Sequence, residues 1–100
     1  MAKKIIWSDQ AHNDKKNILE YWTARNNSTT YSIKLNILFN YSIRIISKYP
    51  KIGRPTDFGN VRAKIVKDYI LFYEEHSATI NILTIWDSRQ NPEKLQEKFQ

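Results

Sequence analysis

The order of apolar and polar residues divides the chain into a short strand, two helices and a group of strands. Residues 4–7 carry three large apolar side chains in a row, which is typical of a strand. Ser8 and Asp9 follow, and both residue types cap helices well. Apolar side chains then recur at helical spacing as far as about Ala24. After a short polar connector, a second helix is predicted from Tyr31 to Lys48.

The second predicted helix has an unusually wide apolar surface. Its main buried stripe is predicted to consist of Leu35, Leu38, Phe39, Ile45, Ile46 and Tyr49. Three further apolar side chains broaden that surface, namely Ile33, Ile37 and Tyr41. Two amphipathic helices joined by a short polar link form an antiparallel hairpin, which must bury its apolar stripe against another element.

The second half of the chain predicts strands. Pro50 ends the second helix, and residues 50–60 form a loop that contains both glycines of the chain and two of its three prolines. Three stretches rich in Ile, Val, Tyr, Phe and Thr follow, and short turns separate them, at Val61–Lys67, Tyr69–Glu75 and Thr79–Asp87. Strands connected this closely form an antiparallel meander. A short helix that begins with Pro92 and reaches Phe99 completes the order.

These elements predict a single α+β domain over residues 1–100 with the order β-α-α-β-β-β-α. A chain of 100 residues has room for one core and one functional face. The second and third strands of the meander are apolar on both sides. One side of the sheet is therefore expected to receive the helical hairpin, and the other to be partly covered or used for binding.

Composition excludes several classes of site. The chain has no Cys, so it has no disulfide and no thiolate metal site. His12 and His76 lie outside any zinc-ligand spacing, and two glycines cannot build a phosphate-binding loop. We therefore expect no metal and no cofactor. The chain also has no apolar run of membrane-spanning length and no signal peptide at its start, so a cytoplasmic protein without membrane contact is expected.

Positive charge is concentrated in the first two thirds of the chain, whose net charge is +6. Residues 1–49 hold eight Lys or Arg against three Asp or Glu, and residues 50–70 hold five against two. Residues 71–100 hold three against five. This distribution suits a polyanionic partner, although a solvated surface explains charge alone equally well.

Several stretches, in this order and at this spacing, resemble the RelE/ParE superfamily of type II toxin–antitoxin and plasmid-stabilisation toxins. The resemblance covers residues 5–95. The stretches that carry it are Ile-Ile-Trp-Ser-Asp at residues 5–9, Tyr-Pro-Lys-Ile-Gly-Arg at 49–54, Val-Arg-Ala-Lys at 61–64, Ile-Leu-Phe-Tyr at 70–73 and Ile-Leu-Thr-Ile-Trp-Asp-Ser-Arg-Gln-Asn-Pro at 82–92. The resemblance implies a helical hairpin packed on a curved antiparallel sheet. It also implies growth inhibition and a cognate antitoxin encoded beside the toxin gene.

The same resemblance suggests which residues could act on a target. RNA-cleaving members of the superfamily hydrolyse messenger RNA in the ribosome without metal, and cations must stabilise the charge on the phosphate. Arg62 and Lys64 are predicted for this role because they alternate onto one face of a strand, with Arg89 able to close the same cluster. The predicted target-binding residues around them are Lys51, Arg54, Lys67 and Trp86.

Each candidate also has a purely structural interpretation. Arg62 and Lys64 could be the solvated side of a half-exposed strand. Arg89 could pair with Asp87 or Glu93 to fix a turn, and Trp86 is more simply a core residue than a base-stacking one.

Three functions remain open from the sequence. The first is a toxin that blocks translation by ribosome-dependent mRNA cleavage, that is, a metal-independent endoribonuclease that binds RNA. The second is a toxin that inhibits DNA gyrase, as ParE-like members do; it stays open because Ile70 stands where RNA-cleaving relatives carry an Arg, and because no His follows His76. The third is a nucleic-acid-binding module without toxicity.

Overall fold

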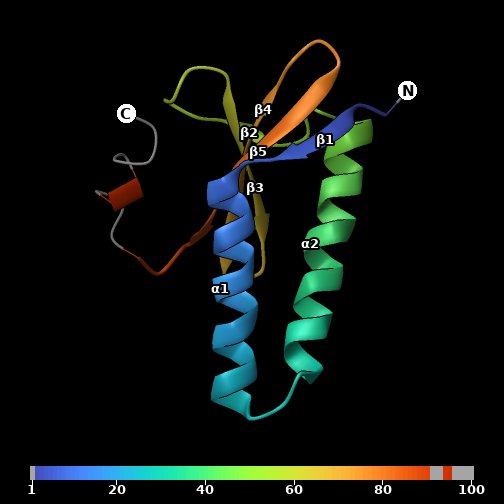
Figure 1. Ribbon diagram of the computed structural model, residues 1–100. Helices are drawn as coiled ribbons and strands as arrows, with labels where there is room; N and C mark the ends of the chain where they lie inside the picture. The colour runs from blue at the N-terminus through green and yellow to red at the C-terminus, as the bar shows by residue number, and fades with distance from the viewer. Residues whose placement is uncertain (1, 91–93, 96–100) are drawn as a thin grey trace.

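The computed structural model describes residues 2–90, 94 and 95 (Figure 1). Its elements, in chain order, are β1 (Lys4–Trp7), α1 (Asp9–Asn26), α2 (Thr30–Lys48), β2 (Arg54–Pro55), β3 (Val61–Val66), β4 (Tyr69–Glu75) and β5 (Thr79–Asp87). The α+β architecture and the helical hairpin are confirmed, and both helix spans agree with the periodicity to within two residues. One strand, β2, lies in the stretch that was predicted to be loop. The helix predicted to begin at Pro92 lies outside the described residues except for Lys94 and Leu95.

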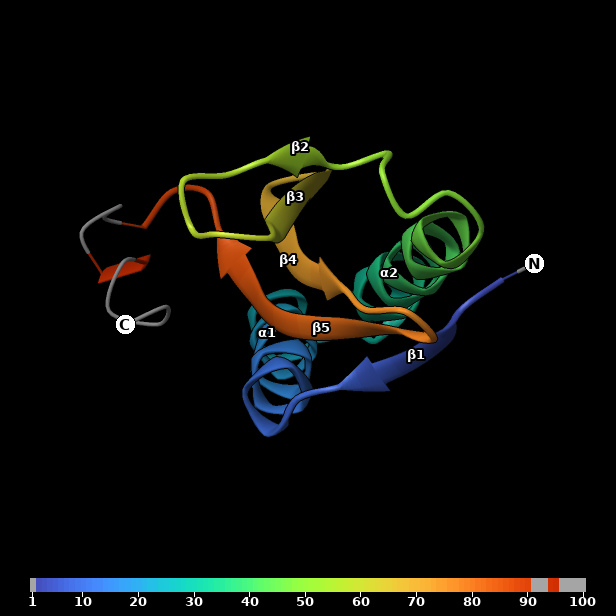
Figure 2. The same ribbon diagram turned by 90° about the horizontal axis from the view of Figure 1, so that it is seen from above.

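The sheet has five strands in the order β1-β5-β4-β3-β2. Strand β1 runs parallel to β5, and every other neighbouring pair is antiparallel. The predicted meander of β3, β4 and β5 is therefore correct, but the sheet as a whole is mixed because β1 joins it as a parallel edge strand. Figure 2 shows the sheet turning from β1 at one edge to β2 at the other, with both helices seen end-on.

Helix α1 begins and ends at residues that suit those positions. The N-cap is Ser8, whose Oγ accepts the Ala11 N–H at 3.0 Å, and the same hydroxyl donates to the carbonyl of Leu83 at 2.8 Å. Asn27 ends the helix in the left-handed conformation with φ 49°, which Asn tolerates better than most residues. The cap therefore also attaches the start of α1 to β5.

Helix α1 also closes the edge of β5 that β1 leaves open. Strand β1 pairs with β5 only as far as Ile82. Beyond that point the Asp14 carboxylate accepts the N–H of Ile85 at 3.1 Å and the hydroxyl of Thr84. These bonds satisfy polar groups that an edge strand would otherwise present to solvent or to another chain.

The buried side of helix α2 agrees only in part with the expected one. Leu35, Phe39 and Ile46 are fully buried, as predicted. The buried side also contains Ile43 and three serines that were not singled out, Ser32, Ser42 and Ser47. The prediction that Tyr49 belongs to the buried stripe was wrong. Like Ile33, Ile37 and Tyr41, which were predicted to broaden that stripe into a wide apolar surface, Tyr49 is exposed, and the four side chains are 55–65% exposed. Serine is small enough to let α2 approach its neighbours closely, and Ser47 Oγ donates to the carbonyl of Lys3.

Two apolar clusters lie on opposite sides of the sheet. The larger one joins both helices to Leu71 and Tyr73 of β4 and to Ile80, Ile82 and Ile85 of β5, and it forms the main core. The smaller one consists of Val61, Phe72 and Trp86, with Phe58, Ala63, Ile70, Leu83 and Leu95 packed against it. The side away from the helices is thus partly covered and apolar. Within the described part of the chain, neither helix is long and apolar enough to cross a membrane.

Candidate functional site

Strand β3 carries both candidate cations on the side of the sheet that faces the helices. Arg62 pairs with Tyr73 and Lys64 pairs with Leu71 across the β3–β4 ladder. Both partners belong to the main core, and paired residues project to the same side of a sheet. Arg62 and Lys64 therefore share a face, as their alternation predicts. That face is not the one free of helices.

The Arg62 guanidinium is bound to the chain's own backbone. Its Nη1 donates to the carbonyl of Gly53 at 2.8 Å and lies 3.4 Å from the carbonyl of Lys51. A polar hollow of about 220 Å³ lies beside it, lined by Lys51, Arg62 and Glu75 among others. Glu75 is in turn paired with Lys3 at 2.8 Å. The pKa of Glu75 is lowered, first by its hydrogen bond from Lys3 and further by the charges of Lys51 and Arg62.

Tyr73, on β4, also binds the backbone of the loop that contains Lys51 and Gly53. Its hydroxyl donates to the carbonyl of Pro50 at 2.7 Å and accepts the N–H of Gly53 at 2.9 Å. A Cβ on Gly53 would lie 2.6 Å from that hydroxyl, so only glycine fits there. Burial raises the pKa of Tyr73 although the Gly53 N–H and Arg62 oppose the rise, so the phenol stays neutral. Together, Arg62 and Tyr73 hold the turn after α2 against the sheet.

Of the predicted target-binding cations, Arg54 and Lys67 do not lie beside Arg62, whereas Lys51 does. Lys51 lines the hollow beside Arg62. Arg54 is exposed on β2 and pairs with Ala63, so it points to the other side of the sheet. Lys67 lies in the β3–β4 turn with φ 58°, four or more residues along the strand from Arg62, which corresponds to roughly 13 Å or more at 3.3 Å per residue.

Arg89 lies at the opposite end of the sheet, so the prediction that it closes the Arg62 cluster was wrong. The N–H of Ser88 donates to Asp68 in the β3–β4 turn at 2.9 Å, which places Arg89 beside that turn. Its guanidinium donates to both carboxylate oxygens of Asp87, at 3.0 and 2.9 Å. The bond from Arg89 lowers the pKa of Asp87, and Asp87 in turn raises the pKa of the guanidinium. This pairing is the structural alternative that the sequence left open.

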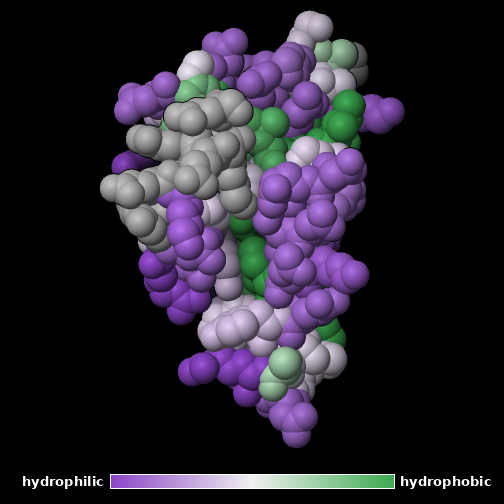
Figure 3. All heavy atoms as spheres, turned by 60° about the vertical axis from the view of Figure 1, so that its left-hand side comes forward, coloured by the Kyte–Doolittle hydropathy of each residue, from purple (hydrophilic) through white to green (hydrophobic). Residues whose placement is uncertain are grey.

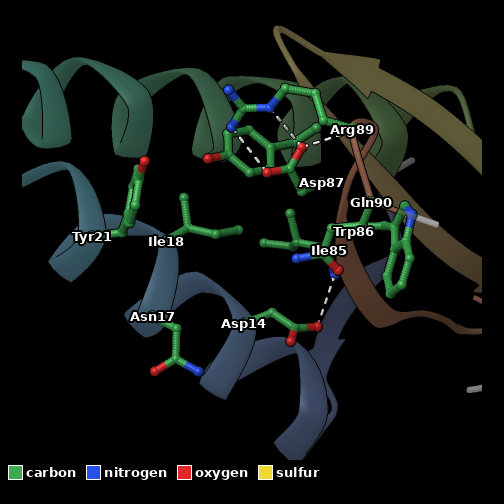
Figure 4. A pocket seen from close by; sticks show the side chains of 10 residues that line it. Asp14, Asn17, Ile18, Tyr21, Ile85, Trp86, Asp87, Arg89 and Gln90 are labelled. Carbon is green, nitrogen blue, oxygen red and sulfur yellow. Dashed lines mark hydrogen bonds and ion pairs between the residues drawn. The ribbon is translucent and has the colours of Figure 1, made fainter. Parts of the chain in front are cut away.

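A pocket of about 420 Å³ lies between α1 and the end of β5, next to Arg89. Ile18 and Ile85 face each other across it, and Tyr21 and the Asp87–Arg89 pair stand at its rim (Figure 4). Tyr69 also lines it and accepts a hydrogen bond from Trp22 Nε1 at 2.8 Å. Figure 3 shows a narrow apolar strip between hydrophilic surfaces on this side of the molecule.

Of the residues that line this pocket, only Arg89 and Trp86 were predicted as site residues from the sequence, and Asp87 was considered only as a partner of Arg89. Asp14, Tyr21 and Tyr69 were not predicted as site residues. Nothing in the local pattern relates α1 to the end of β5, so no sequence feature could have identified the pocket. Trp86 is only 5% exposed and packs with Val61 and Phe72, which agrees with its interpretation as a core residue.

Within the described part of the chain, only some of the groups that RNA cleavage would need lie on one face of the sheet. RNA cleavage needs a base, an acid and cations within reach of one phosphate. The only cations of β3, β4 and β5 are Arg62 and Lys64, and both lie on the helix side. His76 is paired with Glu74 at 2.8 Å at the tip of the β4–β5 hairpin, and His12 stacks on Trp7. Among the described residues, no three His, Asp or Glu gather to hold a metal ion.

Two comparisons with known proteins bear on the whole chain. The family model for the ParE toxin of the type II toxin–antitoxin system parDE matches residues 5–92. A chain of a solved structure of the chromosomal ParDE TA system from P. aeruginosa has the same fold, with a TM-score of 0.75 at 16% identity. That match covers 86% of this chain and 96% of the other. At this identity the structural likeness shows the fold alone. No curated protein sequence matches the chain.

Proposed function

The chain belongs to the ParE toxin family of type II toxin–antitoxin systems, and from that premise we propose that it inhibits growth by binding DNA gyrase rather than by cleaving messenger RNA. A cognate antitoxin is its partner by virtue of the family, and we expect the gene for that antitoxin to lie beside the toxin gene. No catalytic residue is assigned, because the proposed action is binding.

The observation that carries the proposal is the dispersal of the cations. Arg62 donates to two backbone carbonyls on the helix side of the sheet. Arg89 donates to Asp87 at the other end. The helix-free side is lined by the apolar cluster of Val61, Phe72 and Trp86. A phosphorane intermediate would need these charges on one surface, whereas a protein target does not.

Ribosome-dependent mRNA cleavage remains the second candidate, and one feature favours it: Arg62 and Lys64 do lie on the same face. Lys64 is therefore the informative position, since its side chain is only partly buried and, among the described residues, it has no ion-pair partner. If cleavage is the activity, Lys64→Gln should abolish growth arrest. If gyrase is the target, Lys64→Gln should leave it intact.

Purified components separate the two candidates directly. The toxin should inhibit gyrase supercoiling or trap gyrase on cleaved DNA, and it should leave messenger RNA intact in a reconstituted translation reaction. In cells, induction should block thymidine incorporation and induce the DNA-damage response before amino-acid incorporation falls. Codon-specific mRNA cuts without an effect on gyrase would reverse the assignment. Salt-sensitive RNA binding without growth arrest would instead indicate a non-toxic binding module.

A further inference from the structure

The last part of β5 has a backbone edge that no neighbouring strand uses. Strand β1 pairs only with the first residues of β5. Beyond them, the N–H of Ile85 donates to the Asp14 carboxylate. On the opposite edge, the N–H of Ser88 donates to the carbonyl of Asp68 in the β3–β4 turn. Because successive residues of a strand direct their backbone groups to alternate edges, Ile85 and Asp87 both direct theirs away from β4.

Two backbone groups on this edge have no partner within the described part of the chain. The N–H of Ile85 is taken by Asp14, and the carbonyl of Asp87 accepts the N–H of Gln90 at 3.0 Å. The carbonyl of Ile85 and the N–H of Asp87 remain, and no described side chain or loop bonds to either. We call this acceptor and this donor the open edge of β5.

The open edge of β5 belongs to the wall of the pocket of about 420 Å³, because Ile85 and Asp87 both line that pocket. Helix α1 forms the opposite wall, where Ile18 faces Ile85 and Tyr21 stands at the rim (Figure 4). Tyr69, from the main core, adds an aromatic ring to the lining. A pocket of this size, with apolar walls and a few convergent polar groups, is typical of a small-molecule site.

The open edge is too short to hold an extended peptide. A peptide that adds to the edge of a sheet is held by a series of main-chain hydrogen bonds. Asp14 occupies the edge on one side, and the turn that begins at Asp87 ends it on the other. One acceptor beside one donor instead matches a flat heterocycle that carries an N–H next to a ring acceptor. Nucleobases have this arrangement along the edge that they use for base pairing.

The charges around the pocket favour a ligand without charge. Two carboxylates and one guanidinium line it, from Asp14, Asp87 and Arg89, so one negative charge is left over. The guanidinium of Arg89 already donates to both oxygens of Asp87. A phosphate would therefore meet an unfavourable field, whereas a base or a nucleoside would not.

We propose that the pocket between α1 and β5 binds a neutral purine, as the free base or as the nucleoside. The carbonyl of Ile85 accepts an N–H of the purine, and the N–H of Asp87 donates to the neighbouring acceptor of the ring. The flat ring system packs against Ile18 and Tyr69, and its second ring buries more apolar surface than a pyrimidine would. Asn17, at the rim (Figure 4), meets a hydroxyl of the ribose.

The test is a titration of the full-length, isotope-labelled protein with adenosine, followed through the backbone amide signals. The Asp87 amide signal should shift strongly because its N–H gains a hydrogen bond. Purine riboside lacks the amino donor, and the deaza analogue of adenosine lacks the ring acceptor beside it. Each analogue should bind about three- to tenfold more weakly than adenosine, which corresponds to the loss of one hydrogen bond. Adenosine monophosphate should also bind more weakly than adenosine.

Substitutions of exposed residues test the location without disturbing the core. Asn17→Trp places an indole over the mouth of the pocket and should weaken the Kd for adenosine at least tenfold. Its control is Asn40→Trp, at an exposed position of α2. Tyr21→Ala should weaken the Kd several-fold, and its control is Tyr41→Ala because the two tyrosines are 50% and 55% exposed. Both controls should bind adenosine like the unmodified chain.

Three results would overturn the proposal. One is an Asp87 amide signal that neither adenosine nor guanosine moves at millimolar concentration. Another is equal binding of adenosine and the two analogues, since the open edge of β5 would then not be used. The third is equal weakening by Asn17→Trp and Asn40→Trp. A failure to inhibit gyrase would leave all of these titrations unchanged, so it refutes the proposed target without refuting the purine site.

Discussion

The two helices of the hairpin have nearly equal lengths, but their solvent-exposed sides differ in charge and in apolar character. Helix α1 has three acidic and three basic residues, and Tyr21 is its only large apolar side chain that is strongly exposed. Helix α2 has three basic residues and no acidic one, and it exposes Ile33, Ile37 and Tyr41. Both helices pack against the same core with their other sides.

The difference between the exposed sides of α1 and α2 shows which surface residues the fold explains and which it does not. A solvent-facing helix needs only polar residues on its outer side, and α1 satisfies that requirement. The fold gives α2 no reason for an apolar and cationic outer side, because its core contacts are made elsewhere. The exposed apolar side chains of α2 are therefore not explained by the packing of the core. Arg62 is the opposite case, because its guanidinium already donates to two backbone carbonyls of the same chain and is therefore explained by the fold.

The largest predicted effect contrasts the two sides of α2. Phe39→Ala removes a fully buried ring from the core and should lower the free energy of unfolding by about 3–5 kcal/mol. Ile37→Ala, two residues away on the exposed side of α2, should change it by less than about 0.5 kcal/mol. Denaturant unfolding of both variants measures the difference. A comparable loss from Ile37→Ala would mean that the exposed side of α2 does support the fold.

The second prediction concerns the inner side of α1. Asp14→Ala leaves the N–H of Ile85 and the hydroxyl of Thr84 without this acceptor, and it should lower the free energy of unfolding by about 2 kcal/mol. Asn13→Ala, on the exposed side of the same turn, serves as the control and should have almost no effect. If the two variants unfold at the same denaturant concentration, α1 does not close the edge of β5 in solution.

The third prediction concerns the contact between the helices. The Ser32 hydroxyl donates to the carbonyl of Leu19 at 2.9 Å and lies 2.6 Å from Thr23 Oγ1. Ser32→Ala should therefore destabilise the protein by about 1 kcal/mol even though Ala favours helix. Asn40→Ala, at an exposed position of α2, should be neutral or slightly stabilising. Thermal unfolding resolves a change of this size. A Ser32→Ala variant that is more stable than the unmodified chain would contradict a stabilising role of the Ser32 hydrogen bonds to α1.

The smallest effect concerns the rim of the pocket beside α1. Because Arg89 lowers the pKa of Asp87 in the folded state, the pair stabilises the protein at pH values above the ordinary Asp pKa. That contribution disappears as the pH falls through the lowered value. Asp87→Asn should thus be less stable than the unmodified chain at pH 7, and the gap should close as the pH falls below the ordinary Asp pKa and through the lowered one. The effect is small since the pair is solvent-exposed. A gap that does not depend on pH would point to the turn geometry instead.

Part of the candidate site followed from the sequence, and part of it could not. Alternation along β3 correctly placed Arg62 and Lys64 on one face, since strand geometry is local. It could not tell whether that face would meet the helices or solvent. The position of Arg89 depends on where the end of β5 meets the β3–β4 turn, which is a long-range arrangement. The roles predicted for Arg62, Lys64, Arg89, Lys51, Arg54 and Lys67 remain predictions.

The sequence by itself determined the two helices, the end of the second helix at Pro50, the three-strand meander and the excess of positive charge, because periodicity and turn residues act over a few positions. Only the tertiary structure decided that β1 lies parallel to β5. It also decided which arc of α2 is buried. Two apolar rows on that helix have helical spacing, one through Leu35, Phe39 and Ile46 and the other through Ile33, Ile37 and Tyr41. The first row is buried because its side of the helix, which also carries the buried serines, packs against α1 and the chain before β1.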